Sequence, residues 1–211
     1  MENYSLYTEN VIKRNMELEK KPSLLLHACC APCSSYVLEY LNRAFEITLY
    51  FYNPNISTLE EFDKRAEELK RFVGEFPLEN FKEVIIEHYD HDEFLKMVKG
   101  REELHEGGAR CFDCYEQRLQ KSAQYAREKG FDMFATTLSI SPHKNAQWLN
   151  EIGKRLSEEM GLDYLYSDFK KKNGYKRSCQ LSAEYNLYRQ SFCGCEFSKG
   201  ESERRLLNGK D

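Results

Sequence analysis

The sequence predicts an α/β fold, in which a doubly wound, mostly parallel sheet of about five strands carries a C-terminal helical cap. Short apolar runs alternate with segments of helical periodicity along most of the 211 residues. This alternation favours parallel strands joined by right-handed helical crossovers. A hydrophobic content of 41% is enough to build a sizeable core around such a sheet.

The predicted strands are short apolar runs bounded by polar or turn-forming residues. The second run ends at Asn53-Pro54-Asn55, which favours a turn, and the fourth contains the β-branched pair Thr136-Thr137. We expect strands at residues 24–26, 45–52, 84–86, 131–140 and around 164–166.

The predicted helices carry apolar residues three or four positions apart, as in the pattern that begins with Leu59, Phe62 and Ala66. We expect helices from Ser34 or Ser35 to about residue 42, at 59–73, at 92–98, from the second cysteine pair to 129, at 145–160, and in the tail from Ser178 onward. Ligands of doubly wound sheets lie outside the carboxyl ends of the strands. The cysteines that follow the first strand therefore mark the expected site.

The chain is expected to form a single structural unit with two parts. Residues 1–168 are predicted to be the α/β part that carries the metal site, and residues 169–211 the basic loop and helical cap. No stretch approaches the roughly 20 apolar residues that cross a bilayer, so we expect no membrane partner. The first residues lack the basic and apolar regions of a secretion signal, which predicts a cytoplasmic, thiol-reducing location.

The eight cysteines fall into tight groups: Cys29-Cys30-x-x-Cys33, Cys111-x-x-Cys114, Cys179 and Cys193-x-Cys195. In a reducing compartment, clustered cysteines bind metal or perform redox chemistry more often than they form a disulfide framework. Cys111 and Cys114 would share one helix face, and a bend after the first strand would let Cys29 and Cys30 converge. Four thiolates suit either tetrahedral zinc or an iron–sulfur cluster, so both cofactors stay open at this point.

Other residues near these groups allow more than one interpretation. Cys30-Ala-Pro-Cys33 is similar to the C-x-P-C motif of thioredoxin-type exchangers. Cys193-Gly194-Cys195 is too compact for an unstrained disulfide, which is typical of a switchable pair, but two buried free thiols fit equally well. Asp113 could give a hard oxygen ligand to an extra iron, or be a carboxylate favoured at a helix start. Spacing assigns no role to Cys33 or Cys179.

Residues 169–177 combine five cations with two aromatic side chains on a chain whose formal net charge is −4. This charge argues against a wholly basic nucleic-acid binder but not against a local basic patch. We expect RNA contacts from Lys170, Lys171, Lys172, Tyr175, Lys176 and Arg177, with Phe169 or Tyr175 stacking on a base; a solvated loop is the alternative.

Two further sites precede predicted helices. Residues 141–145 could hold a phosphate through backbone N–H groups and Lys144, or form an ordinary capped turn. His27 ends the first strand beside the thiols, where a lone histidine is more often a hydrogen-bonded core residue than a metal ligand.

Five motifs taken together resemble the QueH-type epoxyqueuosine reductases over residues 24–197. They are LLHACCAPCS at 25–34, YNPNI at 52–56, RCFDCY at 110–115, TLSISPHK at 137–144 and FCGC at 192–195. The first strand–helix turn also looks like the PP-loop or HUP-like architecture. The Ser-Gly-Gly phosphate loop of the ATP-using members is absent, so we expect no ATP.

The resemblance implies the last step of queuosine biosynthesis, in which epoxyqueuosine in tRNA is deoxygenated to the alkene by two electrons. It implies a cobalamin-free [4Fe-4S] enzyme with ligands Cys29, Cys30, Cys111 and Cys114. It further implies a redox-active pair, Cys193 and Cys195, and an additional iron near Cys33 and Asp113. The expected partners are a tRNA bearing epoxyqueuosine and an external electron donor. A thioredoxin-like thiol–disulfide oxidoreductase and a zinc-stapled RNA-binding module are the alternatives.

Overall fold

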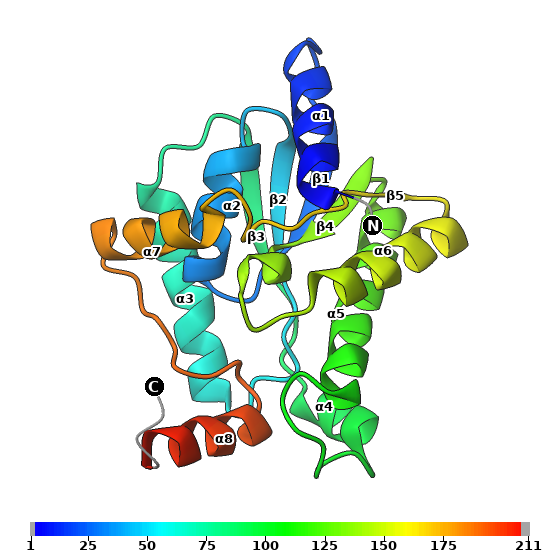
Figure 1. Ribbon diagram of the computed structural model, residues 1–211. Helices are drawn as coiled ribbons and strands as arrows, with labels where there is room; N and C mark the ends of the chain where they lie inside the picture. The colour runs from blue at the N-terminus through cyan, green and yellow to red at the C-terminus, as the bar shows by residue number, and fades with distance from the viewer. Residues whose placement is uncertain (1–2, 208–211) are drawn as a thin grey trace.

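Five strands form one sheet in the order β3-β2-β1-β4-β5, and every pairing is parallel (Figure 1). The strands are β1 Ser23–His27, β2 Glu46–Phe51, β3 Phe81–Ile86, β4 Met133–Thr136 and β5 Asp163–Tyr164. The predicted fold class is confirmed. Because the strand order reverses at β1, the carboxyl ends of β1 and β4 border the crevice where ligands of such sheets bind.

The structure is a computed structural model that describes residues 3–207, with side chains described through residue 201. Of the two predicted parts, residues 1–2 and 208–211 lie outside the described residues. None of the helices within 3–207 is long and apolar enough to cross a membrane.

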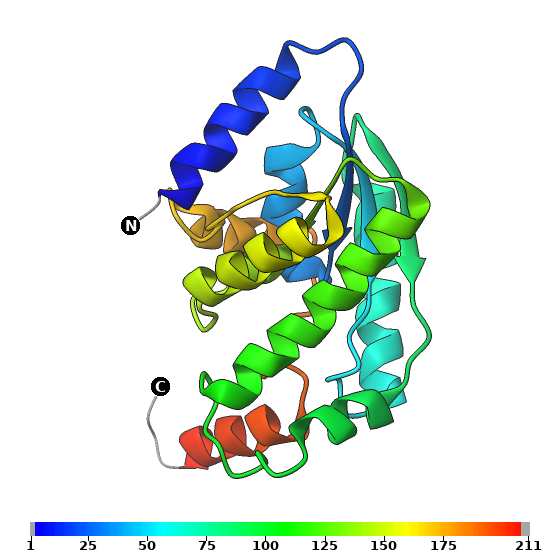
Figure 2. The same cartoon turned by 90° about the vertical axis from the view of Figure 1, so that its right-hand side faces the viewer.

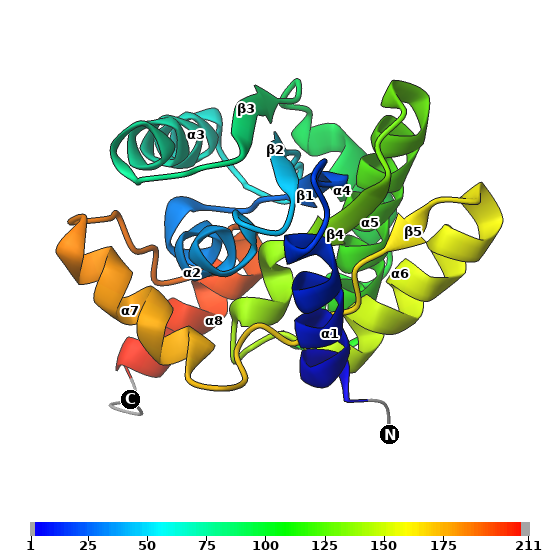
Figure 3. The same ribbon diagram turned by 90° about the horizontal axis from the view of Figure 1, so that it is seen from above.

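Helices cover both faces of the sheet. They are α1 Tyr4–Met16, α2 Ala31–Leu41, α3 Leu59–Glu75, α4 His91–Val98, α5 Ala109–Lys129, α6 Ala146–Met160, α7 Gly174–Glu184 and α8 Glu196–Leu207. Figure 3 shows α2, α3 and α7 on one side of the strands, with α5 and α6 on the other. Leu24 and Leu26 pack with the first group and Leu25 with the second, since successive strand residues point to opposite faces. Both faces of β1 are covered, which explains its continuous apolar run.

Some boundaries differ from the prediction for local reasons. Helix α2 begins at Ala31, three residues before the predicted cap at Ser34, because Pro32 suits the first turn, where its fixed φ is pre-set and its missing N–H costs nothing. Strand β4 ends at Thr136, whose hydroxyl accepts a hydrogen bond from the Leu138 N–H at 3.1 Å and starts a 3₁₀ turn over Thr137–Ile140. Helix α7 begins at Gly174 rather than at Ser178, so part of the predicted basic loop is helical.

Helix α1 was not predicted, and helix α8 lies in the tail where a helical cap was expected. Helix α1 rests on the chain after β5, where the Thr8 hydroxyl donates to the Tyr166 carbonyl at 2.8 Å. Helix α8 follows an irregular segment after α7 and lies beyond the carboxyl ends of the strands, near α4 and the start of α5 (Figures 1 and 2). Phe197 of α8 contacts the Phe94 ring at a centroid distance of 6.3 Å. The tail thus forms the helical cap expected over the site.

His27 holds the carboxyl ends of three strands together. It is fully buried, and burial followed by the nearby Arg118 charge lowers its pKa to about 4, so the imidazole is neutral. Its Nε2 lies 3.0 Å from the Tyr52 carbonyl and must donate to it, which leaves Nδ1 to accept from the Thr136 hydroxyl at 3.0 Å. His27 is the hydrogen-bonded core residue that the sequence predicted.

Candidate active site

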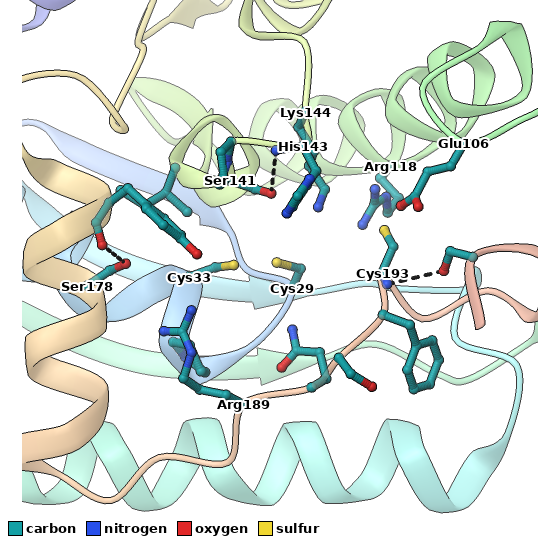
Figure 4. Close-up of a pocket in the computed structure, with 18 residues that line it drawn as sticks. Cys29, Cys33, Glu106, Arg118, Ser141, His143, Lys144, Ser178, Arg189 and Cys193 are labelled. Carbon is teal, nitrogen blue, oxygen red and sulfur yellow. Dashed lines mark hydrogen bonds between the residues drawn. The ribbon is translucent and has the colours of Figure 1, made fainter. Parts of the chain in front are cut away.

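A pocket of about 190 Å³ opens at the carboxyl ends of β1 and β4. Its walls come from the β1–α2 turn, the 140–144 turn before α6, helix α5, helix α7 and the segment 189–193. Figure 4 shows Cys29, Cys33 and Cys193 directed into this space, with Lys144 and Arg118 entering from another wall. Segments distant in sequence therefore place thiols and cations in one pocket.

The first cysteine group is compact. The sulfur atoms of Cys29, Cys30 and Cys33 all lie within 4.8 Å of one another, and those of Cys29 and Cys30 are 3.8 Å apart. Cys30 is extended at the helix N-cap, and the Ser34 hydroxyl donates to its carbonyl at 2.9 Å. The bend between β1 and α2 thus brings adjacent side chains together, as the sequence predicted.

Hydrogen bonding within this group separates the three thiols chemically. Hydrogen bonds from Cys30 and Cys33 lower the pKa of Cys29 well below its usual value. The hydrogen bond to Cys29 raises the pKa of Cys30 to about 12. Hydrogen bonds to Cys29 and Cys30 raise the pKa of Cys33. The three thiols therefore titrate as one interacting group.

The second cysteine pair lies on the first turns of α5. The Cys111 sulfur accepts a hydrogen bond from the Gly107 N–H at 3.3 Å, and Cys114 is buried beside Phe94, Val98 and Cys195. Burial raises the pKa of both thiols, that of Cys114 to about 12. Among the described residues, neither sulfur belongs to the 4.8 Å group around Cys29. Of the four predicted cluster ligands, the structure thus groups Cys29 and Cys30 with Cys33 rather than with Cys111 and Cys114.

The third pair has two different environments. Cys193 lines the pocket, whereas Cys195 is buried with Cys114. Both are free thiols. The segment is fixed by backbone contacts, since the Cys193 carbonyl accepts from Arg65 Nη1 at 3.0 Å and the Gly194 carbonyl accepts from the Ser57 N–H at 3.0 Å.

Two cations face the thiols. Burial disfavours the charges of Arg118 and Lys144, but neighbouring sulfur atoms raise the pKa of both above their usual values. For Arg118 these are Cys114, Cys193 and Cys29, and for Lys144 they include Cys193 and Cys29. Lys144 was noted in the sequence as a phosphate ligand, but Arg118 was missed. Its position four residues after Cys114, on the same helix face, was the available signal.

Asp113 and the basic segment have other partners. Asp113 forms an ion pair with Arg101, which precedes α5. In the basic segment, Lys170 pairs with Asp168 at 2.5 Å, Lys172 pairs with Glu9, and Arg177 pairs with Glu39 at 2.6 Å and Glu184 at 2.8 Å.

The aromatic side chains of the basic segment differ in access. Phe169 is 3% exposed, so the expectation that it could stack on a base is wrong. Tyr175 is 37% exposed and lines the pocket. Of the six predicted RNA contacts, Tyr175 is the one whose side chain reaches the pocket within the described residues.

Comparison with known proteins identifies the family. The family model described as “Epoxyqueuosine reductase QueH” matches residues 24–201. A protein of this name from Streptococcus pyogenes serotype M1 is 44% identical over 198 residues, covering 93% of this chain and 78% of the relative. One from Staphylococcus epidermidis is 41% identical, covering 93% and 84%, and one from Thermotoga maritima is 36% identical, covering 83% and 90%.

The chain belongs to the QueH family. The matched region contains all eight cysteines, Arg118 and Lys144, so the QueH similarity covers the whole pocket rather than the sheet alone. The QueH relatives are named reductases, and this chain is accordingly an oxidoreductase.

Proposed function

We propose that this QueH-family chain reduces epoxyqueuosine in tRNA to queuosine, the last step of queuosine biosynthesis. The observation that carries the proposal is the pocket itself, in which Cys29, Cys33 and Cys193 face Lys144 and Arg118 at the carboxyl edge of the sheet. The printed names of the relatives supply the substrate, epoxyqueuosine.

The proposed cofactor is a [4Fe-4S] cluster, with an additional iron beside it. Cluster ligands would be Cys29, Cys30, Cys111 and Cys114, and the additional iron would lie near Cys33 and Asp113. Compact cysteine thiols beside Lys144 and the buried Arg118, whose Nη2 has no hydrogen-bond partner among the described residues, fit an anionic, sulfur-rich group. When bound, such a cluster supplies electrons singly, and an adjoining iron acts as a Lewis acid.

The ligand assignment needs the two cysteine pairs to approach one another. Cys114 lies in contact with the tail that carries Cys195, and Cys33 already stands in the compact group. Cys33 could therefore replace Cys111 or Cys114 as a thiol ligand of the cluster. Iron-edge anomalous scattering from crystals grown without oxygen would identify the ligands directly.

The reaction requires two electrons and two protons for each epoxide that becomes an alkene and water. Oxidation of two thiols to a disulfide releases the same number of both. We assign this exchange to Cys193 and Cys195, which an external electron donor would return to the dithiol. The Lys144 ammonium in the pocket wall would stabilise negative charge on the departing oxygen.

The basic segment is proposed to contact the anticodon arm, with Tyr175 at the pocket able to stack on a base. Lys171 and Lys176 are exposed and, within the described side chains, form no ion pair, so they are the segment's best phosphate ligands. Phosphate contacts of this kind make affinity depend on salt concentration.

The thiol-exchange alternative is weaker. A C-x-P-C exchanger uses its two thiols alone, whereas here the Cys29 sulfur lies 3.8 Å from that of Cys30 and belongs to the same compact group as Cys33. The zinc-stapled module would bind zinc and be colourless, whereas the proposed enzyme would bind an iron–sulfur cluster and be brown.

One experiment separates the three functions. Protein purified without oxygen should be brown, contain iron and acid-labile sulfide, and convert epoxyqueuosine to queuosine in tRNA when a chemical reductant is supplied. Nucleoside mass spectrometry of the digested tRNA measures the conversion. A colourless zinc-loaded protein would instead be the binding module, and a metal-free dithiol the exchanger.

A further inference from the structure

Arg118 is a buried cation that forms no ion pair with a carboxylate among the described side chains. Its side chain is 1% exposed on α5, where Nε donates to the Cys114 carbonyl at 3.3 Å and Nη1 to Asn53 Oδ1 at 3.4 Å. Nη2 has no hydrogen-bond partner among the described residues. Because burying an uncompensated charge is strongly unfavourable, the guanidinium needs negative charge in its surroundings.

Two kinds of group in the pocket can supply this charge: cysteine sulfur atoms and the Glu106 carboxylate, although the ion pairs of the described residues include none between Glu106 and Arg118. Cys29 and Cys193 line the same pocket as Arg118, and Cys114 lies one helical turn before it, with its carbonyl 3.3 Å from Arg118 Nε. These cysteines come from α5, from the segment before α8 and from the β1–α2 turn. Arg118 thus faces one member of each of the three main cysteine groups.

Other buried arginines are compensated differently. Arg65 is also 1% exposed, but its Nε forms an ion pair with Glu61 at 2.7 Å. Arg110 is 2% exposed and lies 3.7 Å from Glu201. The chain therefore provides carboxylates for two buried arginines and sulfur atoms for the third.

We propose that Arg118 is a positioning residue that compensates the negative charge of the sulfur-bound group and makes its one-electron reduction easier. The inference rests on the proposed function, which supplies that group. Adding an electron increases the negative charge, and a cation buried beside it stabilises the reduced form more than the oxidised form. Arg118 would accordingly raise the reduction potential.

The test measures this potential in protein loaded with iron and sulfide without oxygen. Arg118→Met removes the cation, and Arg118→Lys keeps it. Asn53→Asp leaves Arg118 in place but sets a competing carboxylate beside Nη1. Arg43→Met, an exposed arginine at the far end of α2, controls for the loss of one charge from the chain. Iron and sulfide content, circular dichroism and a dye-monitored titration with dithionite are recorded for each variant.

We expect the midpoint potential of Arg118→Met and Asn53→Asp to shift to more negative values, while Arg118→Lys and Arg43→Met stay near the unaltered protein. A folded Arg118→Met that loses its iron while Arg118→Lys keeps it would also support the inference. An unshifted potential in Arg118→Met, or in Asn53→Asp where Arg118→Met does not fold, would overturn it. Unaltered protein that binds no iron and sulfide would instead remove the proposed function, and the inference with it.

Discussion

Cys193 and Cys195 are separated by one residue, yet their thiols have different surroundings. Cys193 faces the pocket with Cys29 (Figure 4), whereas Cys195 is buried beside Cys114. The intervening Gly194 has a φ of +135°, a region that side-chain-bearing residues rarely adopt. A disulfide between Cys193 and Cys195 would therefore require the turn at Gly194 to change conformation. The stability of this turn can be tested with two substitutions.

Gly194→Ala should destabilise the folded chain. A Cβ at this position would lie 3.1 Å from Asn55 Nδ2 and 3.1 Å from Ile56 Cγ1, in addition to the backbone strain. We expect the free energy of unfolding to fall by about 1–3 kcal/mol, measured by urea denaturation. Gly200→Ala is the matched control, since no atom lies within 4 Å of its Cβ; because Gly200 lies inside α8, this substitution should be neutral or stabilise the chain by up to about 1 kcal/mol. Equal effects of the two substitutions would contradict the assigned role of Gly194.

Arg65→Met should loosen the same turn. Arg65 Nη1 donates to the Cys193 carbonyl at 3.0 Å. Its loss removes this hydrogen bond and the Arg65–Glu61 ion pair, which leaves Glu61 with the Tyr188 hydroxyl as its donor. We expect about 1–3 kcal/mol of destabilisation and faster alkylation of Cys193, followed by mass spectrometry. Arg71→Met, an exposed arginine on the same helix, should leave the alkylation rate unchanged. Slow, unaltered alkylation in Arg65→Met would show that the hydrogen bond does not hold the segment.

Cys193→Ser should abolish repeated turnover with the external reductant while leaving the iron and sulfide content unchanged. The substitution removes the thiol in the pocket, without which no disulfide with Cys195 can form and be reduced. Cys179→Ser, on α7, is the matched control and should turn over normally. Unchanged turnover in Cys193→Ser would end the proposed redox role of the pair.

Lys176→Gln should weaken tRNA binding more than Lys170→Gln does. Lys170 is already paired with Asp168 at 2.5 Å, whereas Lys176 is exposed and, in the described part of the chain, has no ion pair. Loss of one phosphate contact lowers the slope of log affinity against log salt by about one. Fluorescence anisotropy across a salt series measures it. Identical slopes for both variants and the unaltered protein would place the RNA contacts elsewhere.

Asp132 should give a pH-dependent contribution to stability. Its carboxylate accepts hydrogen bonds from the Ser23 hydroxyl at 2.7 Å and the Ser23 N–H at 2.8 Å, which lower its pKa below 3.8. The folded pKa is below the unfolded value, so the stabilisation is present above about pH 4 and is lost as pH falls through the folded pKa. Because the group is exposed, we expect less than about 1 kcal/mol.

The check is Asp132→Asn, compared with the unaltered protein by thermal unfolding between pH 7 and strongly acidic pH. The difference in stability should shrink as the pH falls. Asp63→Asn, an exposed aspartate on α3, serves as the control. A difference that stayed constant with pH would show that the Ser23 contacts do not depend on the carboxylate charge.

The fold was largely predictable because its signals are local. The apolar runs that became β1 to β5, and the periodicities that became α3, α5 and α6, depend on neighbours a few residues away. Helix α1 was missed because its anchoring contact, between Thr8 and Tyr166, joins residues far apart in the chain. The early start of α2 depended on Pro32, which the prediction passed over in favour of Ser34.

The site was predictable only in its parts. The convergence of Cys29 and Cys30 followed from the strand–helix bend, and the contact of the tail with the site followed from chain order. Sequence could not show that Phe169 is buried, or that Lys172 meets Glu9, because these contacts join distant segments. The sequence gives only the number of charged side chains. Whether a lysine can bind a phosphate depends on whether the fold already pairs it with a carboxylate.

The sequence by itself determined the class of sheet, the edge where the pocket opens and the first cysteine group that lines it, since these follow from periodicity, chain order and residue type. Only the tertiary structure decided which thiols share a pocket, and that Arg118 lies buried among sulfur atoms without a described carboxylate partner. The physical reason is that burial and electrostatic compensation depend on distances in space, which residues far apart in the chain acquire only on folding.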